Sequence, residues 1–249
     1  MYNPFSLEGK TVLITGASSG IGAETAIECS RLGANVIITG RNEQRLQETF
    51  SCLDFSFSQK HQQIIADLTD ETSLVSLVDQ LDSLDGLVNN AGVNRVKPLS
   101  FIKQEDFDFV FQNNTFVGIH LIRLLLKKKK LNRNCSIVFT SSISAFYNAP
   151  GRALYASSKA ALTSLMRSAA VELADKNIRV NAVHPGMVET KLIHESLSDE
   201  EREKDMQEYP LKRYGRPEDV AWAIIYFLSD ASSWVTGTSL TIDGGFMLK

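Results

Sequence analysis

An uninterrupted apolar strand followed at once by a glycine-rich turn constrains this fold more than any other segment. Residues Thr11–Thr15 (TVLIT) are apolar or β-branched throughout, which is typical of a central parallel strand buried on both faces. The turn Gly16–Gly22 (GASSGIG) follows directly, and a helical pattern then continues to about Leu32. Glycines let a backbone approach a pyrophosphate, and a helix N-terminus supplies free N–H groups, so this context predicts a phosphate-binding turn. Its GxxxGxG spacing differs from the common GxGxxG, and a plain tight turn is the alternative interpretation.

Strand-like and helix-like segments alternate along the rest of the chain. Further strands are predicted at Asn35–Thr39, Gln62–Ala66, Asp85–Asn89, Ser136–Thr140, Ile178–Val183 and Thr238–Ile242. Helices are predicted at Gln104–Lys130, Arg152–Ala174 and Glu218–Leu228. The alternation predicts an α/β fold with a single doubly wound, Rossmann-type parallel sheet of about seven strands and helices on both faces. No repeat or linker divides the sequence, so residues 1–249 are expected to form a single dinucleotide-binding catalytic domain.

Composition narrows the classes of function. The net charge of −3 gives no support for binding to nucleic acid or to a membrane surface. The three cysteines, Cys29, Cys52 and Cys135, form no CxxC motif and have no partnered histidines, so we expect neither a disulfide framework nor a metal site. The N-terminus lacks the apolar run of a signal peptide, and we therefore expect a cytoplasmic protein.

Residues after the second and third predicted strands indicate which nucleotide would bind. Where an acidic residue would hold the ribose 2′-hydroxyl of NAD, this chain has Arg41, and an arginine suits the 2′-phosphate of NADP. Glu43 is close by but falls within the next helix, so the residues favour NADP over NAD, with a solvated surface arginine as the alternative. Asp67 and Leu68 could meet an adenine edge, or Asp67 could cap the helix that begins near Asp70. Both interpretations of Asp67 remain open.

Tyr155 and Lys159 lie four residues apart in the helix predicted from Arg152 to Ala174, and so share one face. A free phenol has a pKa near ~10, and a cation beside it favours the phenolate and lowers that pKa. A tyrosine tuned in this way can exchange a proton with an alcohol or a carbonyl oxygen. An incidental pair is the alternative, because such pairs are common on helices.

The chain resembles the short-chain dehydrogenase/reductase family over nearly its whole length. The motifs that carry the resemblance are Thr15-Gly16-x-x-x-Gly20-x-Gly22, Asn89-Asn90-Ala91-Gly92, Ser142, Tyr155-x-x-x-Lys159 and Pro185-Gly186. Ser142 precedes Tyr155 by thirteen residues, which is the usual separation in the family. The segments 211–221 and 235–237 look most like the 3-oxoacyl-[acyl-carrier-protein] reductase group.

The resemblance implies a role for each matched residue. Tyr155 would donate the proton in carbonyl reduction, and Ser142 would bind the substrate oxygen. Lys159 would hold the nicotinamide ribose and lower the pKa of the tyrosine. Asn114, matched in preference to Asn113, would hold a water in a proton relay through Lys159. The expected cofactor contacts are Gly16, Ser18, Ser19, Gly20, Ile21, Gly22, Arg41, Asp67, Leu68, Asn90, Ala91, Gly92, Tyr155, Lys159, Pro185, Gly186, Val188 and Thr190.

The activity that the resemblance implies is reduction of a ketone to a secondary alcohol by NADPH, with a 3-oxoacyl thioester as one candidate substrate. Two alternatives stand beside it. One is NAD-dependent oxidation of a secondary alcohol, a steroid or a sugar, and the other is a nucleotide-binding regulatory protein without turnover. Tyr155, Lys159 and Ser142 are all present, although a regulatory protein could dispense with them.

The resemblance also implies a substrate lid at about residues 190–214 and a homotetramer. Apolar residues of the lid either face the substrate or pack the lid on the core: Leu192, Ile193, Leu197, Met206 and Tyr209. The pocket wall is expected to include Ala145, Phe146 and Asn148. The basic cluster Lys127–Lys130 with Arg133 either complements a helix dipole or docks an acidic acyl carrier protein. His184 is expected to be structural.

Overall fold

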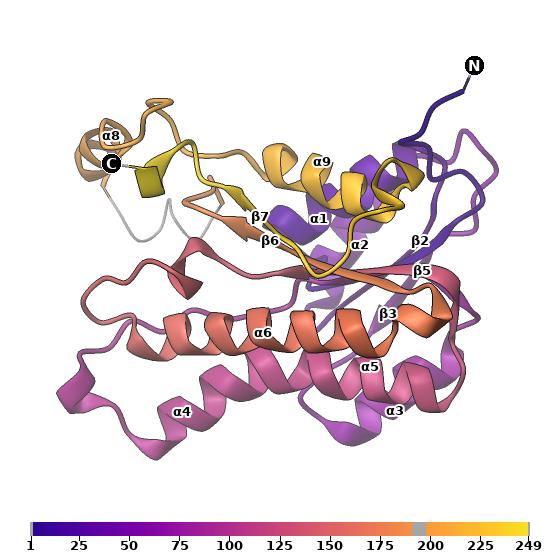
Figure 1. Ribbon diagram of the computed structural model, residues 1–249, viewed down its shortest axis with the longest axis horizontal. Helices are drawn as coiled ribbons and strands as arrows, with labels where there is room; N and C mark the ends of the chain where they lie inside the picture. The colour runs from indigo at the N-terminus through magenta and orange to yellow at the C-terminus, as the bar shows by residue number, and fades with distance from the viewer. Residues whose placement is uncertain (1, 191–197, 249) are drawn as a thin grey trace.

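Seven parallel strands form one sheet in the computed structural model, which describes residues 2–190 and 198–248. The order across the sheet is β3-β2-β1-β4-β5-β6-β7, and Figure 1 shows the sheet between two layers of helices. The strands are β1 (Thr11–Thr15), β2 (Asn35–Gly40), β3 (Gln62–Ile65), β4 (Leu84–Asn89), β5 (Leu131–Thr140), β6 (Arg179–Pro185) and β7 (Ser239–Ile242). The doubly wound parallel sheet that the sequence predicts is therefore confirmed.

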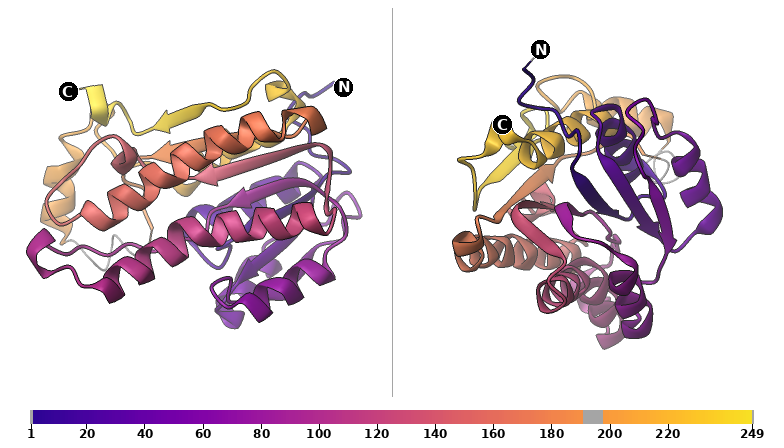
Figure 2. Two further views of the ribbon diagram at one scale, coloured as in Figure 1. Left: turned by 60° about the horizontal axis from the view of Figure 1, so that its bottom comes forward. Right: turned by 90° about the vertical axis from the view of Figure 1, so that its right-hand side faces the viewer.

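Helices cover both faces of the sheet, as the two rotated views in Figure 2 make clear. On one face lie α1 (Gly20–Arg31), α2 (Glu43–Ser51) and α9 (Pro217–Leu228). On the other lie α3 (Glu71–Gln80), α4 (Gln104–Phe111), α5 (Val117–Lys127) and α6 (Ala153–Glu172). Each layer of helices buries its own apolar cluster against the sheet, so side chains of β1, β4 and β5 are buried from both sides.

The chain reverses its winding direction between β1 and β4. Strands β2 and β3 extend the sheet on one side of β1, and β4 to β7 extend it on the other. In open α/β sheets, ligands bind beyond the carboxyl ends of the strands at such a switch point. The turns after Thr15 and Asn89 both leave the sheet at this place.

The helix predicted from Gln104 to Lys130 ends at Lys127 and is interrupted by a π-helical turn, η2 (Gln112–Phe116), between α4 and α5. By length and composition alone, 104–127 is the one helix in the described part of the chain that could cross a membrane. Half of its most apolar window is buried inside the protein, where α5 packs against the sheet. This burial is that of a core helix, so the span is weak evidence for a membrane segment.

Residues 198–214 form the described part of the expected lid. Ser198 caps α8 (Asp199–Met206) in a capping box with Glu201. Tyr209 is buried against Phe246, with ring centroids 4.8 Å apart, and Met206 joins the same cluster. Met206 and Tyr209 therefore pack this segment against Phe246 near the C-terminus, in a cluster separate from the two that flank the sheet, whereas the lid residues 192, 193 and 197 lie outside the described residues.

Candidate active site

The glycine-rich turn after β1 is packed so closely that Gly16 and Gly22 have no room for a side chain. Gly16 has φ +64°, and a Cβ there would lie 2.8 Å from the Cα of Ala91. A Cβ on Gly22 would lie 2.4 Å from the Gly16 carbonyl oxygen. The backbone N–H groups at the start of α1 receive no side-chain cap from Ser19. This cradle fits a dinucleotide pyrophosphate, because it offers free donors and a positive helix end at close range.

Thr15 and Asn90 join the turn after β1 to the turn after β4. The Thr15 hydroxyl donates to the Val88 carbonyl and accepts from the N–H groups of Asn90 and Ala91, at 3.2, 3.0 and 3.1 Å. The Asn90 amide donates to the carbonyls of Thr15 and Gly16, each at 3.3 Å. The matched Asn90-Ala91-Gly92 segment thus holds the floor of the candidate cofactor site in place.

A cleft of about 760 Å³ lies over these turns. It brings together twelve of the expected cofactor contacts: Gly16, Ser18, Ser19, Gly20, Ile21, Arg41, Asp67, Leu68, Asn90, Ala91, Gly92 and Thr190. Gly22 lies behind the turn, where its missing side chain lets the backbone close up. The remaining expected contacts belong to the walls around Tyr155 and to the segment after β6, and they do not line this cleft.

The cleft has a basic end beyond β2. Arg41 and Arg45 both line it and are both exposed. Arg45 lies in the first turn of α2, whereas Arg41 precedes that helix, and no motif in the sequence indicates Arg45 as a cofactor contact. Glu48 is the acidic residue on this wall of α2, and its carboxylate accepts a hydrogen bond from Gln44.

Asp67 does not cap the helix that follows β3, which decides one alternative left open by the sequence. Asp70 is the cap of α3, because its carboxylate accepts from the N–H of Ser73 at 2.7 Å. The carboxylate of Asp67 instead accepts from the backbone and hydroxyl of Thr69, at 2.9 and 2.7 Å. The hydrogen bond from the Thr69 hydroxyl is the main cause that lowers the pKa of Asp67. A fixed carboxylate therefore stands beside Leu68 on the cleft wall.

Tyr155, Ser142 and Lys159 lie together beside this cleft. A hydrogen bond links the side chains of Ser142 and Tyr155. The Lys159 ammonium lies 5.8 Å from the centroid of the Tyr155 ring and donates to the carbonyl of Thr140 at 2.8 Å. The pairing predicted from the i, i+4 spacing is therefore present on α6.

The pKa of Tyr155 is raised, which corrects the expectation that Lys159 lowers it. Burial raises it most, and the Ser142 hydrogen bond and the charge of Arg152 oppose that rise. Lys159 directs its ammonium to the Thr140 carbonyl and is itself 4% exposed, so burial lowers its pKa to about 8. Burial thus outweighs the two influences that lower the pKa of Tyr155, and Lys159 is not one of them.

Asn114 faces the site from the π turn. Its side chain accepts from the N–H of Val93 at 2.7 Å and donates to the Val93 carbonyl and the Ser158 hydroxyl, at 3.0 and 2.9 Å. The Asn114 oxygen and the Lys159 nitrogen approach the place where a Cβ of Gly92 would lie, at 3.1 and 3.4 Å. Asn113 instead donates to the Phe109 carbonyl. The structure thus brings Asn114 into the site, while its role in a proton relay stays a prediction.

The segment after β6 closes the site from the other side. The N–H of Gly186 donates to the Ile242 carbonyl at 2.9 Å, and Val188 bridges to Gly215. The Thr190 methyl lies 3.2 Å from the place where a Cβ of Gly20 would sit. Thr190 therefore reaches the glycine-rich turn, whereas Pro185 is buried at the end of its strand.

The basic cluster after α5 is partly committed to local contacts. Lys128 forms an ion pair with Asp79, and the Lys130 ammonium donates to the Leu81 carbonyl. Both contacts join the end of α5 to α3, which supports the structural interpretation for these two lysines. Lys127 and Arg133 are exposed.

Comparison with known proteins gives consistent similarities over the full chain. A family model described as Enoyl-(Acyl carrier protein) reductase matches residues 16–247. The 3-oxoacyl-[acyl-carrier-protein] reductase FabG of Thermotoga maritima is 37% identical over 97% of this chain and 99% of its own length. A 7α-hydroxysteroid dehydrogenase complexed with NADH and 7-oxo glycochenodeoxycholic acid is 35% identical, with a TM-score of 0.88 over 98% of both chains. The Pseudomonas aeruginosa RhlG/NADP active-site complex is 31% identical, with a TM-score of 0.90 over 99% of both chains.

Proposed function

Because the chain belongs to the short-chain dehydrogenase/reductase family, whose members are oxidoreductases acting on CH–OH and C=O groups with a nicotinamide cofactor, we propose that it reduces a ketone with NADPH. The observation that carries the proposal is the cluster of Ser142, Tyr155 and Lys159 beside a cleft with a glycine-rich floor. These groups suit a carbonyl oxygen on which negative charge develops. The product is a secondary alcohol.

Each residue of the cluster has one task in this mechanism. The bound cofactor would supply the hydride to the carbonyl carbon. The Ser142 hydroxyl donates to the carbonyl oxygen and orients it, and the Tyr155 hydroxyl transfers its proton to that oxygen. The raised pKa keeps Tyr155 protonated before the reaction, so the phenol is ready as a donor. Lys159 holds its positive charge near the phenolate that forms and so stabilises the product state.

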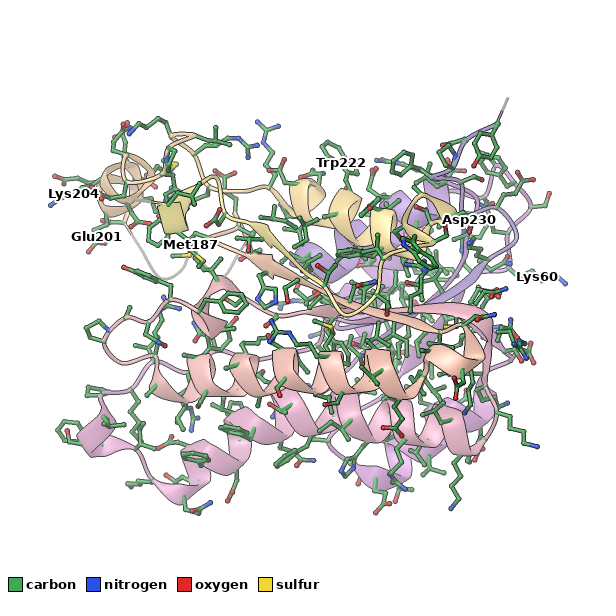
Figure 3. The ribbon with its side chains drawn as sticks, in the orientation of Figure 1. Lys60, Met187, Glu201, Lys204, Trp222 and Asp230 are labelled. Atoms are coloured by element: carbon green, nitrogen blue, oxygen red, sulfur yellow. The ribbon has the colours of Figure 1, made fainter. Side chains whose placement is uncertain are left out.

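The basic end of the cleft favours NADPH over NADH. Arg41 and Arg45 line it, and β2 ends at Gly40 without an acidic residue. Two guanidinium groups suit a 2′-phosphate, whereas a ribose 2′-hydroxyl calls for a carboxylate. Arg41→Asp is expected to move the preference in kcat/KM toward NADH by at least tenfold, as one lost charged hydrogen bond would. Lys204→Ala on α8, remote from the cleft, is the control (Figure 3). An unchanged preference in Arg41→Asp would show that Arg41 does not contact the phosphate.

We propose a 3-oxoacyl thioester as the ketone, presented by an acyl carrier protein. The similarity to the Thermotoga maritima reductase over the full chain supports this choice. Lys127 and Arg133 are exposed and suit an acidic partner, although Lys128 and Lys130 have local partners. Docking is expected to weaken in Lys127→Glu and to stay unchanged in Lys128→Ala.

An NAD-dependent dehydrogenase of a secondary alcohol or steroid is the second candidate. The 7α-hydroxysteroid dehydrogenase with bound NADH supports it, because that protein is nearly as similar to this chain. The two candidates differ in the nucleotide that they use and in the shape of the ketone. A regulatory protein without turnover would retain nucleotide binding alone.

The proposal includes a cytoplasmic homotetramer. Helix α4, the π turn η2 and helix α6 leave Phe107, Phe116 and Val171 exposed, respectively, and such side chains suit a subunit interface. Small exposed residues of α6, Ala160 and Ser164, would allow close helix contact. Light scattering after size-exclusion chromatography is expected to give four chains for the wild type and fewer for Val171→Asp.

The deciding experiment measures oxidation of NADPH and NADH with an acetoacetyl thioester and with a panel of ketones that includes a 7-oxo steroid. Rapid NADPH turnover on the thioester is the expected result. Tyr155→Phe is expected to bind NADPH as before and to lose nearly all turnover, because the proton donor is gone. Turnover of the steroid with NADH alone would favour the second candidate. Retained turnover in Tyr155→Phe would refute the assignment of the proton donor.

A further inference from the structure

His184 is a fully buried histidine at the end of β6, next to the candidate active site. Its Nδ1 lies 3.0 Å from the backbone carbonyl oxygen of Ser142. A carbonyl oxygen can only accept a hydrogen bond, so Nδ1 carries the proton and donates it. Burial lowers the pKa of His184, the hydrogen bond with Ser142 opposes that shift, and the cations of Lys159 and Arg167 lower the pKa further, which favours the neutral ring.

Backbone hydrogen bonding between β5 and β6 stops just before Ser142. The last hydrogen bond of the ladder on this side of β5 runs from the N–H of Ser141 to the Val183 carbonyl, at 2.9 Å. Two residues later comes Pro185, which has no N–H and cannot extend the ladder. The imidazole of His184 therefore supplies the contact from β6 that holds β5 where it passes into the catalytic loop.

His184 holds the same loop a second time through its ring face. The ring stacks on Phe146, with centroids 4.7 Å apart and planes 29° apart. Phe146 ends the short helical turn η3 (Ile143–Ala145), and Ser142 begins it, because its hydroxyl accepts from the N–H of Ser144 at 3.1 Å. Both ends of the turn that carries Ser142 thus contact one imidazole.

The other ring nitrogen, Nε2, is buried and makes no hydrogen bond with the part of the chain that the structure describes. Burying a polar atom without a partner costs free energy, and an apolar side chain of similar size would avoid that cost. Packing alone therefore does not explain a histidine at this position, whereas the hydrogen bond that Nδ1 donates to Ser142 does.

We propose that His184 is a positioning residue, which fixes the Ser142 backbone through its Nδ1–H and so directs the Ser142 hydroxyl toward Tyr155 and the substrate oxygen. The inference rests on the proposed function, because Ser142 matters only if a carbonyl is reduced. It goes beyond that function, since His184 does not line the cofactor cleft and acts through the Ser142 backbone.

A double-mutant cycle separates positioning from simple packing. His184→Leu removes the donor at similar volume, and His184→Asn keeps an amide N–H at the position of Nδ1. In otherwise wild-type protein, His184→Leu is expected to lower kcat about tenfold, the effect of one hydrogen bond, and His184→Asn is expected to recover most of it. In the Ser142→Ala background, His184→Leu is expected to change kcat less than twofold, because the group through which it acts is gone.

A second measurement, by NMR, does not depend on turnover and therefore needs no substrate. With ¹³Cζ-labelled tyrosine, the Tyr155 resonance is identified by its loss in Tyr155→Phe. Ser142→Ala is expected to shift it, because a hydrogen bond to the phenol is lost, and His184→Leu is expected to shift it in the same direction. An equal loss of kcat in both backgrounds, or an unmoved resonance in His184→Leu, would overturn the positioning role. Inactive wild-type protein with the expected shifts would refute the proposed function alone.

Discussion

Replacing Lys159 by methionine is expected to make the protein more stable while it abolishes turnover. Lys159 is 4% exposed, and burial lowers its pKa from 10.5 to about 8. At pH 7 the folded protein must therefore hold a proton that it binds less tightly than the unfolded chain does. A depression of this size corresponds to about 3 kcal/mol of lost stability, which methionine does not incur.

The lost hydrogen bond works against this gain. The Thr140 carbonyl accepts from Lys159 at 2.8 Å, and in Lys159→Met that buried oxygen loses its donor. A hydrogen bond from a charged group contributes about 1.5 kcal/mol or somewhat more. The net gain is then about 1 kcal/mol, which raises the midpoint of thermal unfolding by about 2–4 °C for a chain of this size.

The pH dependence identifies the cause. Between pH 8 and 10.5 the folded wild type releases the Lys159 proton while the unfolded chain still holds it, so wild-type stability rises with pH in this window. The advantage of Lys159→Met therefore shrinks between pH 7 and pH 9.5. Thermal unfolding without cofactor, followed by circular dichroism at equal protein concentrations, measures it.

The control is Lys204→Met, because Lys204 is exposed on α8 and has no burial penalty to relieve. Its midpoint is expected to stay close to that of the wild type at both pH values. A Lys159→Met protein that melts below the wild type at pH 7, or an advantage that does not change with pH, would refute the reasoning. Either result would mean that the buried ammonium is well compensated in the fold.

Three further outcomes follow from the described contacts. Gly22→Ala is expected to weaken NADPH binding more than tenfold in a fluorescence titration, because its Cβ would lie 2.4 Å from the Gly16 carbonyl and displace the turn. Asn114→Leu is expected to lower the free energy of unfolding in urea by about 2–3 kcal/mol, because the backbone of Val93 loses two buried partners. Asp106 has a pKa lowered to about 2, mainly by its hydrogen bond with Lys97, so its contribution to stability is present above pH 4 and lost as the pH falls through 2. Asp106→Asn is therefore expected to be less stable than the wild type at pH 7, with a difference that shrinks steeply as the pH falls toward 2, as acid unfolding curves would show.

The sheet could be predicted from the sequence because its signals are local. Thr11–Thr15 is apolar along its whole length, so it forms a central strand whatever surrounds it, and the structure places β1 at those residues. The same holds for the glycine-rich turn, where Gly16 and Gly22 meet backbone atoms that would exclude any side chain. In both cases the residue types alone fix the local backbone.

Features that depend on tertiary contacts could not be predicted in the same way. The helix from Gln104 carries two poor helix formers, Asn113 and Asn114, at its middle, but their residue types do not specify the π turn that points Asn114 inward toward Val93. Arg45 gains its place on the cleft wall only when α2 is packed beside the glycine-rich turn. His184 directly precedes the Pro185-Gly186 motif, but its role as a donor becomes apparent only when β5 and β6 lie side by side.

The sign of the Tyr155 pKa shift is the clearest case of this limit. Helical spacing correctly placed Lys159 beside the ring, at 5.8 Å, and Coulomb's law alone then predicts a lowered pKa. The spacing in the sequence gives no information on how deeply the two groups are buried. Burial raises the pKa of the phenol and lowers that of the ammonium. Both shifts favour the neutral forms, so the apoprotein holds a protonated phenol and a weakly held ammonium proton. The proposed reduction requires a protonated phenol before the reaction, and the raised pKa of Tyr155 favours this state.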